Sequence, residues 1–166
     1  QILLEPINMK KIQKKFKHDY LTLILEDVAL NSKLFSKVVQ RINTTMRSAD
    51  KWKQSIWGIK GIPRKTIHTI LFEYLRGNLI AATDASVKYG RAGHAFCYAN
   101  KKTGKILFSS VSKVCGSIKF TTSYRAEMMS IIAGLTLLDL ILRAAGISKA
   151  KVVLHTDSET SILVTK

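Results

Sequence analysis

The chain has 166 residues, of which 27 are Lys or Arg and 11 are Asp or Glu, so its formal net charge is +16. This length suits one packed domain or a small domain with an extension, and a hydrophobic content of 46% excludes wholesale disorder. The basic excess favours a polyanionic partner, because cations displace the counterions condensed on phosphate backbones. We expect nucleic acid; a solvated basic face and an anionic membrane surface are the alternatives.

Cysteine usage and the apolar runs exclude other classes. Cys97 and Cys115 have no CxxC or Cys/His spacing, so neither a zinc site nor a disulfide framework is expected. The most apolar run, 128–138, is too short to span a bilayer and lies between Glu127 and Asp139. No export signal opens the chain, so an intracellular location (cytoplasm or nucleus) without membrane association is expected. Because it begins at Gln1 rather than Met, we expect a piece of a longer polypeptide.

Residues 1–78 are predicted to form a basic, mainly helical extension or connector. A lysine-rich run occupies 10–17, helix-like apolar spacing covers 21–30 and 34–42, and a helix with Pro63 in its first turn runs to about Leu75. Trp52 and Trp57 lie among lysines and can stack on bases, although such residues more often anchor a core.

The sequence changes at 76–78 from basic segments with helical spacing to short apolar runs, which predicts a domain boundary there. Residues 79–166 are predicted to be an α/β domain. Short apolar runs predict strands, with a hairpin loop at 100–104, and a long run of helical spacing ends at Gly146. The predicted order is strand 79–84, strand 94–99, strand 105–111, helix 124–145 capped by 121–123, strand 151–156, and a helix from 158.

Two carboxylates follow apolar strands in matching contexts. Asp84 is the second residue of Thr-Asp-Ala-Ser (83–86), and Asp157 is the second residue of Thr-Asp-Ser (156–158). If the two strands are parallel neighbours joined by the helical crossover, their ends lie about 5 Å apart. Carboxylates that close repel unless a proton or cation lies between them. The alternative is that each Asp is a helix cap or a turn residue.

Glu127 is the third acidic residue of interest, because it shares a helical stripe with Ile131, Leu135, Leu138 and Leu142. We therefore expect Glu127 to point inward, where an unpaired carboxylate needs a cation, a raised pKa or a salt-bridge partner such as Arg125 or Lys88. Asp139 is expected to be a solvated charge.

The residue types at these positions predict a metal site. Three carboxylates without an aligned His or Cys suit a hard cation such as Mg²⁺ or Mn²⁺. Two such ions about 4 Å apart activate a water and stabilise the leaving oxygen in phosphodiester hydrolysis.

These motifs resemble the ribonuclease H family over residues 79–166. The resemblance lies in the Thr-Asp-small-Ser strand, the Arg-Ala-Glu that begins a long helix, the strand ending Thr-Asp-Ser, and their order. The helix motif is most similar to ribonuclease H domains of retroelement reverse transcriptases. The family implies a mixed sheet whose first three strands are antiparallel, two-metal catalysis, and cleavage of RNA in RNA·DNA hybrids.

The resemblance also implies roles for single residues. Asp84, Glu127 and Asp157 match the metal-binding and catalytic acids. The implied nucleic-acid contacts are Ser86, Lys88, Arg91, Ser123, Tyr124, Arg125 and Ser158. Ala85 replaces a usual Gly, and Tyr124 stands where Asn is common.

The chain departs from the family at its C-terminus, where the fifth strand, last helix and fourth acid of the family are missing. We therefore expect an incomplete ribonuclease H-like domain whose strand 151–156 has no outer neighbour, completed by further chain or by another chain. The leading hypothesis is a nuclease for RNA·DNA hybrids. The alternatives are an inactive module that binds nucleic acid or protein, and, ranked last, a transposase or integrase core.

Overall fold

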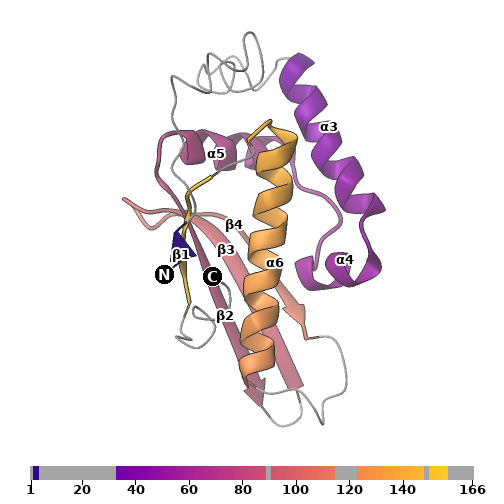
Figure 1. The fold of residues 1–166 in the computed structure, drawn as a ribbon, viewed down its shortest axis with the longest axis vertical. Coiled ribbons are helices and arrows are strands. Elements are labelled where there is room, and N and C mark those ends of the chain that lie inside the picture. Colours follow the sequence, from indigo (N-terminus) through magenta and orange to yellow (C-terminus); the bar gives the residue numbers. More distant parts are fainter. Residues whose placement is uncertain (1, 4–32, 89–90, 115–122, 148–149, 157–166) are drawn as a thin grey trace.

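The computed structural model describes residues 2–3, 33–88, 91–114, 123–147 and 150–156. They form an α/β fold in which helices pack on a mixed sheet (Figure 1). The strands are β1 (Ile2–Leu3), β2 (Leu79–Lys88), β3 (Arg91–Asn100), β4 (Ile106–Lys113) and β5 (Val153–His155), and the helices are α3 (Lys33–Ser48), α4 (Lys51–Trp57), α5 (Arg64–Leu75) and α6 (Ser123–Ala144).

The sheet has the strand order β1-β5-β2-β3-β4. Strands β2, β3 and β4 pair antiparallel, and β5 pairs parallel with β2. Both the antiparallel start and the parallel pairing across the α6 crossover are therefore confirmed. The predicted hairpin at 100–104 is also confirmed, with Gly104 at a φ of 73° and the Asn100 side chain accepting from the backbone N–H of Lys102 at 2.8 Å.

All four strand predictions needed correction in their bounds. Strand β3 covers 91–100 instead of 94–99, and β4 covers 106–113 instead of 105–111. Strand β2 runs four residues past Asp84, because it stays paired with β3 as far as the pair Lys88 and Arg91. The second half of β2 was not predicted because Asp84 and Ser86, which are exposed, interrupt the apolar run. Strand β5 covers only Val153–His155 of the predicted 151–156.

The outer edge of β5 is occupied, so the prediction that this strand lacks an outer neighbour is wrong. Ile2 pairs antiparallel with Leu154, and Leu3 pairs with Val153. The extension 1–78, predicted to be mainly helical, therefore also contains a short strand. Unpaired N–H and C=O groups along an apolar strand favour the addition of another strand, and the chain's own start supplies it.

Helix α6 lies against the sheet along most of its length (Figure 1). Half of its 22 residues are buried, and Gly146 ends it with a φ of 86°, as predicted. Gly134 lets the helix approach closely, since a Cβ there would lie 3.3 Å from the Cβ of Phe96 and 3.6 Å from the Thr83 methyl. The Tyr98 hydroxyl donates to the carbonyl of Gly134 at 2.6 Å.

The helices before the sheet agree in part with the prediction. Helix α3 is longer than the expected 34–42, and Pro63 is the N-cap of α5 rather than a residue of its first turn. Helix α4 was not predicted, because its seven residues include two lysines and only a short apolar pattern. The runs 10–17 and 21–30 lie outside the described residues.

Trp57 joins the helical part to the sheet part. Its side chain is 1% exposed, and its indole N–H donates to Thr136 Oγ1 of α6 at 3.0 Å. Buried side chains from both sides of the predicted boundary at 76–78 belong to one hydrophobic core. Trp52, in contrast, is 53% exposed. None of the helices in the described part of the chain has the length and apolarity needed to cross a membrane.

The two tryptophans give a direct test of this shared core. Trp57→Ala should lower the free energy of unfolding by about 3–5 kcal/mol, the usual cost of truncating a large buried aromatic. Trp52→Ala is the matched control and should cost less than about 1 kcal/mol, because its side chain is half exposed. Urea denaturation followed by circular dichroism measures both; equal costs would contradict the assignment of Trp57 to a core that joins the two parts.

Candidate active site

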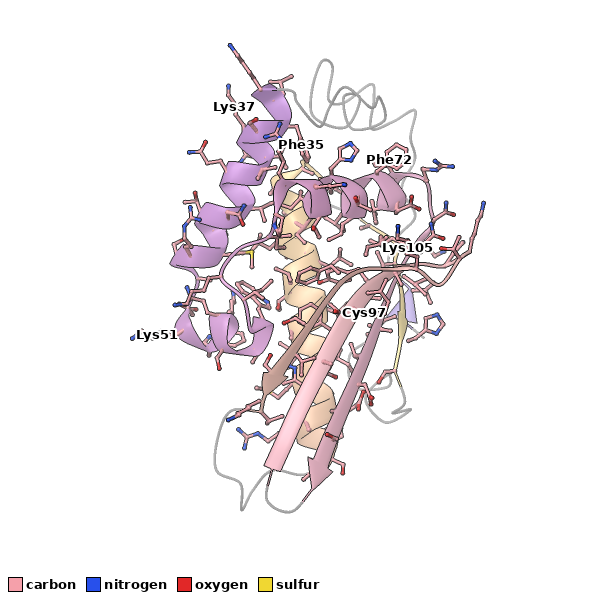
Figure 2. The ribbon with its side chains drawn as sticks, turned by 180° about the vertical axis from the view of Figure 1, so that it is seen from behind. Phe35, Lys37, Lys51, Phe72, Cys97 and Lys105 are labelled. Atoms are coloured by element: carbon pink, nitrogen blue, oxygen red, sulfur yellow. The ribbon has the colours of Figure 1, made fainter. Side chains whose placement is uncertain are left out.

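Asp84 lies on the face of the sheet opposite to α6. Thr83, its neighbour, is buried and contacts the position of Gly134 in α6. Successive side chains of a strand point to opposite faces, so Asp84 points away from the helix, and it is exposed. Figure 2 looks onto this face, with β2, β3 and β4 in front of α6 and Cys97 labelled on β3. The carboxylate Oδ1 of Asp84 accepts from the backbone N–H of Ala85 at 2.9 Å.

The carboxylate is placed at the end of a ladder rather than at the end of a strand. Pairing between β2 and β5 runs from Ile80 with Val153 to Ala82 with His155. In the part of the chain that the structure describes, β2 has no partner on this side from Thr83 onward. Asp84 therefore sits on an interior strand just past the end of the described parallel ladder, at the carboxyl ends of the two strands, which is where open sheets bind their ligands.

Glu127 approaches from the other side of the sheet. It is the fifth residue of α6, just after the first turn, and only 7% of its surface is exposed, which confirms the prediction that it points inward. Its Oε1 accepts a hydrogen bond of 2.6 Å from the hydroxyl of Thr156, which directly follows β5. This bond satisfies one oxygen of a buried carboxylate and ties the start of the helix to the end of the parallel ladder.

The two carboxylates can act together just past the end of the described β2–β5 ladder. Asp84 lies on the face of the sheet away from α6 and Glu127 on the face that α6 covers. In the middle of the sheet, a strand between them would keep the two carboxylates apart by the thickness of the sheet. Because the β5 ladder stops at Ala82, no described strand stands between the edge of β2 and the Thr156–Glu127 pair. The topology thus directs both acids to one corner of the sheet.

The donor set at this corner fits a hard divalent cation. Asp84 offers an exposed carboxylate, and Glu127 keeps a second oxygen beyond the one bound to Thr156. Carboxylate oxygens are the ligands that Mg²⁺ and Mn²⁺ prefer. Asp157 lies outside the described residues. Within those residues, no three His, Cys, Asp or Glu side chains gather closely enough to hold an ion by themselves.

The predicted nucleic-acid contacts divide into three groups. Ser86 is exposed and shares the open face with Asp84, two residues away. Ser123 and Tyr124 are exposed in the first turn of α6, while Arg125 is half-buried. Lys88 and Arg91 form the last pair of the β2–β3 ladder. Their side chains, and the whole of Ser158, lie outside the described part of the chain. Asp139 is exposed as expected and pairs with Arg143 at 2.9 Å.

Sequence reasoning missed two residues that shape this corner. Thr156 was noted only as part of a motif, yet its hydroxyl is the hydrogen-bond donor to Glu127. The recurrence of Thr directly before Asp in both strands was the available signal. The second is His94, which pairs with Ala85 next to Asp84 and carries no motif of its own.

His94 is buried beside the site with its ring nitrogens unsatisfied. It is 2% exposed, and neither nitrogen has a hydrogen-bond partner among the described residues. Burial lowers the pKa of His94 below its usual 6.5, because the charged imidazolium loses its hydration.

Comparison with known protein families, with characterised proteins and with solved structures finds no significant match.

The bond between Thr156 and Glu127 can be tested through stability. Thr156→Val keeps the shape of the side chain but removes the donor, and the buried carboxylate then loses a partner. We expect a loss of roughly 1–3 kcal/mol in the free energy of unfolding, the usual cost of an unsatisfied buried group. Thr156→Ser retains the hydroxyl and should cost clearly less. A Ser variant as unstable as the Val variant would show that the methyl group, not the hydrogen bond, matters.

His94 should make stability depend on pH. Its folded-state pKa is lowered, so below the unfolded value near 6.5 the unfolded chain binds a proton that the folded chain does not, and stability falls as pH falls. We expect the urea midpoint to drop between pH 7.5 and pH 5.5, with a smaller drop in His94→Leu. His155→Gln, at an exposed position, is the control and should keep the wild-type dependence. An unchanged slope in His94→Leu would contradict this account.

Proposed function

We propose that the chain is a metal-dependent endonuclease of the ribonuclease H type that hydrolyses the RNA strand of RNA·DNA hybrids, as part of a retroelement reverse transcriptase polyprotein. The observation that supports this most is the corner of the sheet where the parallel β2–β5 ladder stops beside Asp84 and α6 delivers Glu127 to Thr156. The same topology and the same three motifs distinguish the family that the sequence resembles.

In this proposal the residues of the chain have separate tasks. Asp84 presents its carboxylate on the open face, where a nucleic-acid backbone has access. Glu127 supplies a carboxylate whose orientation is fixed by the Thr156 hydroxyl, and Asp157 is the third acid of the site. Bound Mg²⁺ ions supply the activation of the attacking water and the stabilisation of the leaving oxygen. Without acids to hold these ions the basic surface alone would bind a polyanion but not cut it.

A rigid support for Glu127 is consistent with this role. Catalytic groups act well when neighbouring packing and hydrogen bonds hold them in place before the substrate arrives. The carboxylate is buried, its helix is anchored on the sheet through Gly134, and its Oε1 is held by Thr156.

The second candidate function is a ribonuclease H-like module that binds nucleic acid or protein without cutting. One observation favours it: Glu127 already has a structural bond to Thr156, so its retention does not by itself require a metal. Titration with Mn²⁺ separates the two functions, because a binding-only module should show no saturable uptake that depends on Asp84.

Cleavage assays on substituted chains test the proposal. Extended at its C-terminus to complete the domain, the polypeptide should cut a labelled RNA·DNA hybrid in Mg²⁺ or Mn²⁺. Asp84→Asn or Glu127→Gln should then reduce the rate by about 100-fold or more, since losing a ligand removes several kcal/mol of charge stabilisation. Glu73→Gln removes an acid of α5 whose side chain accepts from Asn100 at 2.7 Å, away from both proposed binding sites, and should leave the rate within about twofold.

Two results would count against the proposal. Activity that survives both Asp84→Asn and Glu127→Gln would show that the site is elsewhere. Saturable binding of the hybrid by the wild-type chain, without any cleavage in either metal, would favour the binding module.

A further inference from the structure

We propose that α3 and α4 form a second nucleic-acid-binding surface, separate from the catalytic corner, along the groove that they make with α6. This surface consists of the exposed cations of α3 and α4 together with the groove residues between these helices and α6. Its ligand is the phosphate backbone of the hybrid, and the identity of that ligand rests on the proposed function.

The charged residues within the two helices are all positive. Helix α3 carries Lys33, Lys37, Arg41 and Arg47 and no acidic residue, and α4 adds Lys51 and Lys53 after the single acid Asp50. A solvated helix face ordinarily mixes both signs. Lys33, Lys37 and Arg41 instead follow one another at four-residue spacing, where like charges repel and disfavour the helix. An anionic partner along this side would relieve that repulsion.

The spacing of these cations matches a nucleic-acid strand. Lys33 and Arg41 are eight residues apart on a helix that rises 1.5 Å per residue, so the row spans about 12 Å. Phosphates advance by about 3.4 Å per nucleotide along a duplex strand, and the row therefore covers three to four of them. Figure 2 shows Lys37 on α3 and Lys51 on α4 extending away from the sheet.

The groove beside this row offers further contacts for a backbone. It has a volume of about 520 Å³, and its lining includes Arg41, Lys53, Trp57 and the hydroxyl-bearing Thr45 and Ser48. Two acids, Asp50 and Asp139, also line it, and Asp139 is paired with Arg143 at 2.9 Å, so Arg41 and Lys53 are the groove cations that a phosphate can contact. Arg41 also donates to the carbonyl of Ala144 at 3.3 Å, which fixes it at the end of α6.

Trp52 favours a nucleic acid over an acidic protein segment. Its ring is 53% exposed on α4, and Lys53 Nζ lies 5.6 Å from the ring centroid. An exposed aromatic ring beside a cation provides stacking for a base or ribose next to a contact for phosphate. An acidic peptide would use the cations but has no need of the ring.

Matched triple substitutions test the surface. Lys33→Gln, Lys37→Gln and Lys51→Gln together remove three exposed charges from the surface, and Lys101→Gln, Lys102→Gln and Lys105→Gln remove three exposed charges from the β3–β4 hairpin. Binding of a short RNA·DNA hybrid to the full chain is measured without divalent ions at several salt concentrations. The helix variant should bind at least about tenfold more weakly, with a salt slope smaller by about 2–3, whereas the hairpin variant should change the slope by less than about 0.5.

A second readout locates the bound strand. The indole N–H resonances of Trp52 and Trp57 should shift when the hybrid binds to the wild-type chain and to Asp84→Asn, and much less in the helix variant. Equal weakening by both triple variants would overturn the proposal, because it would indicate diffuse attraction. Binding of the hybrid without a shift of either indole resonance would overturn it as well. So would indole shifts that occur with an acidic peptide but not with the hybrid.

These outcomes are distinguishable from those for catalysis. A hybrid that binds along α3 and α4 but is never cut would leave this surface intact and contradict the nuclease. Cleavage with no difference between the two triple variants would leave the nuclease intact and contradict this surface.

Discussion

The structure depends on helix α6 being buried along two sides at once. One side approaches the sheet closely enough that Gly134 lies against Thr83 and Phe96, and the other receives Trp57 of α4, whose indole N–H donates to Thr136. A helix fixed on both sides cannot rotate or slide without opening the core. Its N-terminal part, which carries Glu127, is therefore held in place on the sheet.

This constraint explains how a small set of motifs becomes a site. The helix is the crossover between β2 and β5, so the parallel ladder and the placement of Glu127 have one common origin. The ladder stops at Ala82, and the chain then reaches Thr156, whose hydroxyl donates to Glu127. Among the described residues, the exposed carboxylate of Asp84 and the buried carboxylate of Glu127 consequently both lie near the end of the β2–β5 ladder.

The sequence was most informative where periodicity and turn chemistry were local. The hairpin at 100–104, the long helix ended by Gly146 and the parallel neighbours β2 and β5 followed from apolar spacing, glycine placement and the matching strand motifs. It was least informative where the partner is distant along the chain. The end of β2 looks polar because Asp84 and Ser86 face away from α6, and the edge pairing of Ile2 and Leu3 with β5 joins residues about 150 positions apart. The bond between Thr156 and Glu127 likewise exists only after the crossover has formed. The seven residues of α4 are too short for a period, and tertiary contacts of Ile56 and Trp57 stabilise this helix.

The convergence of Asp84 and Glu127 on one cation site is the central claim, and paramagnetic broadening by Mn²⁺ measures it most directly. In an amide-resolved NMR titration of the full chain, substoichiometric Mn²⁺ should broaden the signals of 83–86, of the first turn of α6 and of Thr156 together, and Asp84→Asn should abolish the effect. Broadening confined to Asp139 or Glu73, or spread evenly over exposed acids, would contradict the claim.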